Sequence, residues 1–138
     1  MLIPKKLKHR KQFRGKRKGI STRTNSLSFG AMALRALERG WITSRQIEAA
    51  RRAITRYMKR GGKVWIRIYP DRVVTKSAAE VGMGGGKGAP DHFVATVKPG
   101  TIIFECDGLD DATLKRALEL GKHKLPVKTA IVGKPYEK

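Results

Sequence analysis

The sequence has few of the residues that disulfide frameworks, zinc centres and membrane spans need. Cys106 is the only cysteine in 138 residues, so a disulfide framework and a cysteine zinc site are excluded, and its apolar neighbours favour a buried structural thiol. No apolar run approaches the ~18 residues of a membrane span, and the N-terminus lacks the apolar segment of a secretory signal. We expect a cytosolic protein without a membrane segment, and an organelle origin is equally compatible with these features.

Groups suited to catalysis are also scarce. The three histidines, His9, His92 and His123, are far apart and lack the His-x-x-x-His spacing of a helical metal site. The acids within residues 107–111 coincide with the expected start of a helix, where carboxylates act as caps. No Gly-x-Ser-x-Gly elbow is present. We therefore expect no enzymatic activity, no cofactor and no metal site.

Acidic residues are too few to balance the basic ones. The chain has 31 Lys and Arg against 11 Asp and Glu, a formal net charge of +20, whereas a small soluble domain needs a magnitude of about 2–8. The excess is in the first half, because residues 1–69 contain 20 basic and 2 acidic residues and residues 70–138 contain 11 and 9. Such self-repulsion disfavours a compact fold unless a polyanion neutralises it, so we expect the first half to bind nucleic acid.

Residues 1–23 form a basic N-terminal extension without a single acid. Its apolar residues are too sparse to offset the entropy of ordering, so we expect it to be disordered when free and to order along a nucleic-acid backbone. A generic basic tail or a localisation signal is the alternative, but localisation signals are usually shorter. Residues 24–138 are then a single α+β RNA-binding domain. The cations of the extension are Lys5, Lys6, Lys8, Arg10, Lys11, Arg14, Lys16, Arg17, Lys18 and Arg23.

The stretch at residues 42–69 is the most strongly patterned part of the chain. Thr43 is a good N-cap, Gln46 can complete a capping box, and Ile42 and Ile47 can form a hydrophobic staple. Gly61 is expected to end this helix in a left-handed conformation. A strand is expected at residues 63–69. The aromatic residues on one face of that strand, Trp65 and Tyr69, either stack on an exposed base or ribose or join the core.

Two faces of the expected helix differ in chemistry. At about 100° per residue, an apolar stripe lies opposite a row of cations, and Glu48 is the only acid. A solvated helix face usually mixes charges of both signs, so this face favours a phosphate ligand supplied from outside. The stripe contains Ile47, Ala50, Ile54, Tyr57 and Met58, and the opposite row contains Arg45, Arg52, Arg56 and Lys59.

The remaining pattern predicts an α+β fold in which two main helices pack on a mixed or antiparallel sheet. We expect a short helix at residues 31–38, a short strand at 72–75, a hairpin formed by strands at 92–98 and 101–106, and a closing strand at 125–132. Asp110 should cap a second helix that runs to residue 120 and ends at Gly121.

Between these elements, residues 76–90 form a long glycine-rich loop. The cluster at residues 82–88 fails both phosphate-binding motifs, since a Walker-type loop needs glycine at Val81 and a hydroxyl at Gly88, and the dinucleotide fingerprint needs glycine at Lys87. Loops of this length are usually functional or disordered. A flexible, thin loop of this kind is suited to entering a crowded space, and a plain surface loop is the alternative.

Seven blocks of the sequence carry a resemblance to a known family: MLIPKKLKHRKQFRGKRKG, SFG, WITSRQIEAARRAITRYMKRGGKVWIRIYPD, VGMGGGKG, KPG, FECDG and KLPVKT. Together they extend over essentially the whole chain, and they resemble the bacterial large-subunit ribosomal protein of family sixteen. The resemblance implies an α/β-hammerhead fold and a location between the central protuberance and the peptidyl transferase region. It also implies binding to large-subunit ribosomal RNA and to neighbouring ribosomal proteins, support of late subunit assembly, and contact with aminoacyl-site or peptidyl-site transfer RNA. No membrane and no homo-oligomer is expected.

The resemblance assigns roles to particular residues. It implies that the cations of the extension and of the long helix bind ribosomal RNA, and that the glycine loop approaches transfer RNA. The family's usual loop is similar to VRMGKGKG, whereas Gly82 and Gly85 replace two of its cations here. The implied helix contacts are Arg45, Arg51, Arg52, Arg56, Lys59 and Arg60, and the loop residues are Gly82, Met83, Gly84, Gly85, Gly86, Lys87 and Gly88.

Two other classes are compatible with the charge. A DNA-compacting protein would bind duplex DNA and ribosomal RNA fragments comparably. A cationic membrane-surface protein would need a broad apolar face opposite the basic one, but Ile47, Ile54 and Tyr57 supply a narrow stripe that the core requires.

Overall fold

In the computed structural model, residues 2–5, 19–20, 26–59, 61–76 and 89–133 are described. Two helices and seven strands occur in these residues, and four of the strands lie between the helices in sequence. The elements are β1 (Met32–Ala36), β2 (Gly40–Thr43), α1 (Ser44–Met58), β3 (Lys63–Ile66), β4 (Arg72–Lys76), β5 (Ala89–Val97), β6 (Ile102–Asp107), α2 (Asp111–Lys122) and β7 (Thr129–Gly133).

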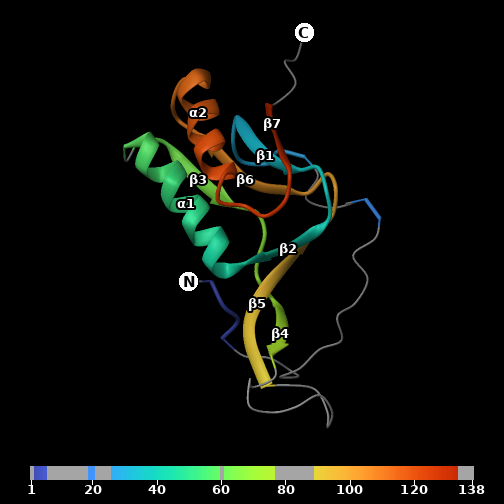
Figure 1. Ribbon diagram of the computed structural model, residues 1–138. Coiled ribbons are helices and arrows are strands. Elements are labelled where there is room, and N and C mark those ends of the chain that lie inside the picture. Colours follow the sequence, from blue (N-terminus) through green and yellow to red (C-terminus); the bar gives the residue numbers. More distant parts are fainter. Residues whose placement is uncertain (1, 6–18, 21–25, 60, 77–88, 134–138) are drawn as a thin grey trace.

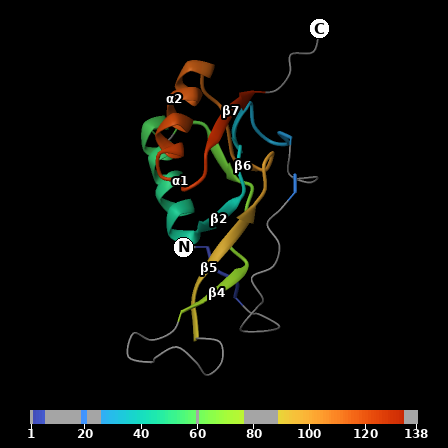
Figure 2. The same cartoon turned by 45° about the vertical axis from the view of Figure 1, so that its right-hand side comes forward.

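The strands form two antiparallel sheets. One has four strands in the order β3-β6-β1-β7, and the other has three in the order β2-β5-β4. Both helices lie together beside the four-stranded sheet, while β4 and β5 extend away from it as an arm (Figure 1 and Figure 2). The predicted α+β class with two main helices is confirmed.

The predicted helix at residues 31–38 is wrong, because this segment contains strand β1. Alanine, leucine and methionine favour helix as single residues, but β1 lies between β6 and β7 and pairs with both. Ala33, Leu34 and Ala36 are buried there. Hydrogen bonds from two strands distant in sequence therefore override the local preference.

The predicted hairpin of residues 92–98 and 101–106 is also wrong. The turn is present, with the Thr101 N–H donating to the Lys98 carbonyl at 3.1 Å, but the two strands belong to different sheets. β5 pairs with β2 and β4, whereas β6 pairs with β1 and β3. One of these partners is β2, a strand that the sequence pattern did not predict.

The start of α1 agrees with the prediction. Thr43 is the N-cap: its hydroxyl accepts from the Gln46 N–H at 3.2 Å, and the Gln46 side chain accepts from the Thr43 N–H at 2.8 Å. Of the predicted apolar stripe, Tyr57 is the exception, since it is 39% exposed. It lies at the edge of the stripe, where the aromatic ring reaches solvent. The buried members are Ile47, Ala50, Ile54 and Met58.

The end of α1 differs from the prediction. Lys59, with a φ of 51°, adopts the left-handed conformation that we expected of Gly61, and Gly62 follows with a positive φ. The strand after it is shorter than predicted, ending at Ile66, although the Arg67 N–H still donates to the Ile103 carbonyl at 2.9 Å.

Helix α2 is capped by Asp110, as predicted, and the Asp110 carboxylate accepts from the Thr113 N–H at 3.1 Å. The helix does not end at Gly121 but includes it and continues to Lys122. A Cβ at Gly121 would lie 2.6 Å from Cγ1 of Ile54, so this glycine allows the two helices to approach each other. Its role is in packing rather than capping.

The core lies between the helices and the strands. Phe104, Leu34 and Ile54 are among its largest fully buried side chains, and Cys106 is buried with them. Cys106 is buried, as expected, and burial raises the pKa of its thiol to about 12. Neither helix is long and apolar enough to cross a membrane, within the described residues.

Candidate nucleic-acid interface

The outer face of α1 carries a row of exposed cations opposite the buried stripe. Arg45, Arg52, Arg56 and Lys59 are all exposed, while Ile47, Ala50, Ile54 and Met58 anchor the helix to the core. Arg45, Arg56 and Lys59 pair with no acid among the described residues. Burial of one face therefore fixes the direction in which the other face presents its charge.

Glu48 organises two arginines on this face. Its carboxylate forms an ion pair with Arg51 Nη2 and accepts from Arg51 Nε at 3.2 Å, and it accepts from Arg52 Nε at 3.1 Å. The hydrogen bond from Arg51 holds the pKa of Glu48 below its usual value, and the same contact raises the pKa of Arg51. The carboxylate thus stays ionised at neutral pH.

A hollow of ≈ 370 Å³ lies beside this pair on the helix surface. We call it the α1 hollow, and four of its five lining residues are cations. The lining residues are Arg51, Arg52, Thr55, Arg56 and Lys59.

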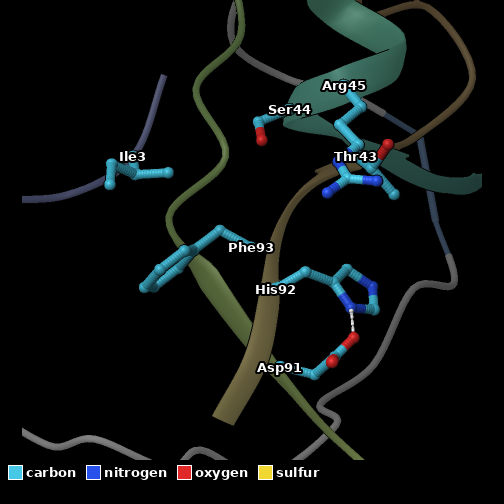
Figure 3. Close-up of a pocket in the computed structure, with 7 residues that line it drawn as sticks. All are labelled: Ile3, Thr43, Ser44, Arg45, Asp91, His92 and Phe93. Carbon is cyan, nitrogen blue, oxygen red and sulfur yellow. Dashed lines mark hydrogen bonds and ion pairs between the residues drawn. The ribbon is translucent and has the colours of Figure 1, made fainter. Parts of the chain in front are cut away.

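A second hollow lies at the start of α1. It is formed where residues 2–5, the first turn of α1 and the beginning of β5 meet (Figure 3). Figure 3 shows the Arg45 guanidinium and the His92 ring on one side of β5 and the Phe93 ring on the other. His92 is exposed and its Nδ1 lies 2.6 Å from Asp91 Oδ2, as expected of a residue at the surface.

A buried carboxylate anchors residues 28–30, the segment that leads into β1. Glu105, fully buried on β6, accepts through Oε1 from three consecutive backbone N–H groups, those of residues 28–30, at 2.9, 3.0 and 3.1 Å. Its Oε2 pairs with Arg67 Nη1. Burial alone would raise the pKa of Glu105, but the hydrogen bonds from Arg67 and the backbone outweigh it and lower the pKa.

The aromatic residues near this carboxylate contact protein groups. Phe29 stacks on Trp65 with ring centroids 5.9 Å apart, and Arg67 lies over the Phe29 ring at 5.1 Å. A Cβ at Gly30 would lie 2.7 Å from the Cys106 carbonyl oxygen, so the segment crosses β6 very closely. Trp65 is partly buried and contacts the Phe29 ring.

Tyr69 is the more exposed of the two aromatic residues that the sequence singled out. It is 46% exposed, and its hydroxyl donates to the Ile3 carbonyl oxygen at 2.6 Å. This bond joins the first residues of the chain to the segment after β3. Lys5, two residues further on, is exposed.

Comparison with known proteins decides the family. The model of the family described as ribosomal protein L16p/L10e matches residues 4–132. The chain belongs to this family. One relative, the large ribosomal subunit protein uL16c of Physcomitrium patens, is 54% identical over 132 residues, which are 96% of each chain.

Family membership makes the chain a structural constituent of the large ribosomal subunit. It confirms the resemblance drawn from the sequence and a location on the ribosome. The family is generally non-enzymatic. As a ribosomal protein, the chain associates with ribosomal RNA and other ribosomal proteins.

The family's expected RNA-binding residues are only partly within the described residues. Lys5 and five cations at α1 are described, and the structure brings the latter onto one helix surface. The glycine loop joins β4 to β5, whose last described pair is Lys76 and Ala89. The residues outside the described part are Lys6, Lys8, Arg10, Lys11, Arg14, Lys16, Arg17, Lys18, Arg23, Arg60 and Gly82, Met83, Gly84, Gly85, Gly86, Lys87 and Gly88.

Two features escaped the sequence prediction. The Glu105 and Arg67 pair was missed, although a lone carboxylate between Phe104 and Cys106 indicates a buried charge that needs partners. The role of Glu48 was also missed, because an acid three and four residues before two arginines was interpreted only as a weak counter-charge. Within the described residues no group of three potential ligands could hold a metal ion.

Proposed function

We propose that this chain binds large-subunit ribosomal RNA through the cationic face of α1 and the basic extension, residues 1–23. The observation that supports this most directly is the row of exposed cations opposite the buried stripe of α1. Three of these cations have no acid partner among the described residues. Their compensating anion is therefore phosphate of the RNA backbone.

The mechanism is electrostatic and structural. Each cation that neutralises a phosphate releases condensed counterions, which makes the affinity fall steeply with salt. Arginine can bind phosphate with two parallel hydrogen bonds, so Arg45, Arg52 and Arg56 also fix orientation. The folded domain, residues 24–138, holds the helix rigid. The extension, at about 3.3 Å per residue when extended, reaches RNA that the domain does not.

We also propose that the loop at residues 82–88 contacts aminoacyl-site transfer RNA near the peptidyl transferase centre. The arm formed by β4 and β5 supports this, because it extends away from the helices and the four-stranded sheet and ends where the loop begins (Figure 1 and Figure 2). Peptidyl-site transfer RNA is the alternative ligand. Through these contacts the chain supports late assembly of the subunit and translation.

The α1 face can be tested with two matched double variants of the full chain. Arg52→Gln with Arg56→Gln removes two cations from α1, and Lys115→Gln with Arg116→Gln removes two exposed cations from α2. Binding to transcripts of large-subunit ribosomal RNA domains is measured over a range of salt concentrations. We expect the slope of log affinity against log salt to become shallower by about 1.4–1.8 for the α1 variant alone.

Two results would contradict the proposal. The first is an equal loss of slope in both variants, because it would mean that α1 contributes only net charge. The second is a wild-type affinity for duplex DNA that equals its affinity for the ribosomal transcripts, because it would favour a DNA-compacting protein.

A further inference from the structure

The α1 hollow has a floor and walls that follow from helix geometry. At about 100° per residue, Glu48, Thr55 and Lys59 fall in one row along the outside of α1. Arg51 lies on one side of this row, and Arg52 and Arg56 lie on the other. The floor is Thr55, a short residue among long ones, whose hydroxyl donates to the Arg51 carbonyl at 2.9 Å. A short side chain at the centre leaves room that the cations surround.

Glu48 lies at one end of the same row and contacts one arginine on each side of the row, Arg51 and Arg52. It contacts Arg51 through Nε and Nη2, and it contacts Arg52 through Nε. The other N–H groups of both guanidiniums make no contact with an acid in the described part of the chain. Each arginine therefore has one edge fixed by the carboxylate and further donors available to a ligand.

We propose that the α1 hollow binds one phosphate group of the RNA backbone and that Glu48 positions Arg51 and Arg52 to receive it. The inference rests on the proposed function and identifies where on α1 a phosphate binds. Four cations line the hollow, and among the described residues Glu48 is the only acid that pairs with any of them, so the site remains strongly attractive to an anion. Because the arginines are already ordered, less rotamer entropy is lost when the phosphate binds.

If Glu48 positions the two arginines, its substitution should change the RNA affinity in the direction opposite to that expected from the change in net charge. Glu48→Gln raises the net charge by one, so a mere counter-charge would oppose RNA binding and its loss would raise affinity. A positioning residue has the reverse effect, since its loss frees both arginines. We expect Glu48→Gln to lower the affinity of the full chain for the ribosomal RNA transcript by about tenfold, a size set by the ordering of two side chains.

Glu119→Gln is the matched control. Glu119 on α2 accepts from Arg116 at 3.1 Å in an i,i+3 pair in which the acid follows the arginine, and this pair lies outside the hollow. We expect it to leave affinity unchanged or slightly raised. Association and dissociation rates separate the two effects further, because charge acts mainly on association and a bound contact acts on dissociation. Glu48→Gln should raise the dissociation rate, and Glu119→Gln should not.

A second pair of variants tests whether the ligand needs the space inside the hollow. Both variants leave the net charge of the chain unchanged. Thr55→Leu fills the floor with apolar atoms and should lower affinity by about tenfold if the ligand is excluded. Ala112→Leu adds the same apolar side chain at an exposed position of α2, outside the hollow, and should bind as the wild type does. Urea unfolding of each variant confirms that it is folded before binding is compared.

The outcomes are distinct. Higher affinity in Glu48→Gln, or wild-type binding by Thr55→Leu, would overturn the phosphate site while the charge dependence of the α1 face could still hold. A wild-type chain that does not prefer the ribosomal transcript would overturn both the site and the proposed function. Loss of affinity in Glu48→Gln and Thr55→Leu, with both controls unchanged, would establish the site.

Discussion

Helices α1 and α2 are built alike on their inner faces and differently on their outer faces. Each has a side-chain N-cap and a largely buried apolar stripe, and they pack against each other where Gly121 of α2 meets Ile54 of α1. On the outside, α1 has four arginines and one acid, whereas α2 has three basic and two acidic residues. The fold requires the shared features, and α1 has the larger excess of positive charge.

The difference in charge between the two outer faces distinguishes what a stable helix needs from what the proposed RNA binding needs. A balanced surface such as that of α2 is sufficient for a stable helix, because opposite charges a turn apart help slightly and like charges repel. The excess of cations on α1 therefore lowers the intrinsic stability of this helix, and under the proposed function a bound anion offsets that cost. The comparison between the two helices yields three predictions about stability.

The largest effect should come from the face that the helices share. Ile54→Ala on α1 and Leu118→Ala on α2 each remove a fully buried side chain, and each should lower the free energy of unfolding by about 2–5 kcal/mol. Urea denaturation of both variants measures this. If one variant unfolds at the same urea concentration as the wild type, the two helices do not contribute equally to one core.

A smaller effect distinguishes the two N-caps by their response to acid. Thr43→Ala should cost about 1 kcal/mol at any pH, because a hydroxyl cap does not titrate in this range. Hydrogen bonds from Thr113 lower the pKa of Asp110 from its ordinary 3.8. Its stabilisation is complete above that ordinary value and is lost as pH falls through the lower folded value.

Hydrogen exchange on acidification measures this difference. The N–H groups at the start of α2 should exchange faster, relative to the intrinsic rate, as pH falls below 3.8, while those at the start of α1 keep their protection. Equal loss of protection at both starts would mean that global unfolding, not the Asp110 cap, controls the acid response.

The smallest effect concerns the surface acids. Glu48→Gln and Glu119→Gln each remove a helix ion pair, and each should change the free energy of unfolding by only a few tenths of a kcal/mol. The two variants are compared by urea denaturation at low and high salt. A loss of several kcal/mol in Glu48→Gln alone would make Glu48 a structural residue, and its effect on RNA binding would then be secondary.

Local signals predicted the helices well because their causes are local. The capping box of Thr43 and Gln46, the Asp110 cap and most of the buried stripe of α1 depend on residues within a few positions of each other. The cationic row on α1 follows from the same periodicity. Both helices and the candidate interface on α1 could therefore be found from the sequence.

The missed features depend on residues that are distant in sequence. From the sequence alone, Gly121 is typical of a helix end, and its packing role is evident only from its contact with Ile54. Likewise, the partners of the Glu105 carboxylate, residues 28–30 and Arg67, are far from it in sequence. The order of the strands has the same origin, since β1 is a strand only because β6 and β7 pair with it.

The sequence by itself determined that one half of the chain carries the charge, that one helix presents it on a single face, and which family the chain resembles. The tertiary structure decided which strands pair, which glycine allows close packing, and how Glu48 and Thr55 shape a hollow between arginines. The physical reason is the sequence separation over which each kind of interaction acts. Capping and periodicity act over one or two turns, whereas pairing, burial and the enclosure of a site require the whole chain to be folded.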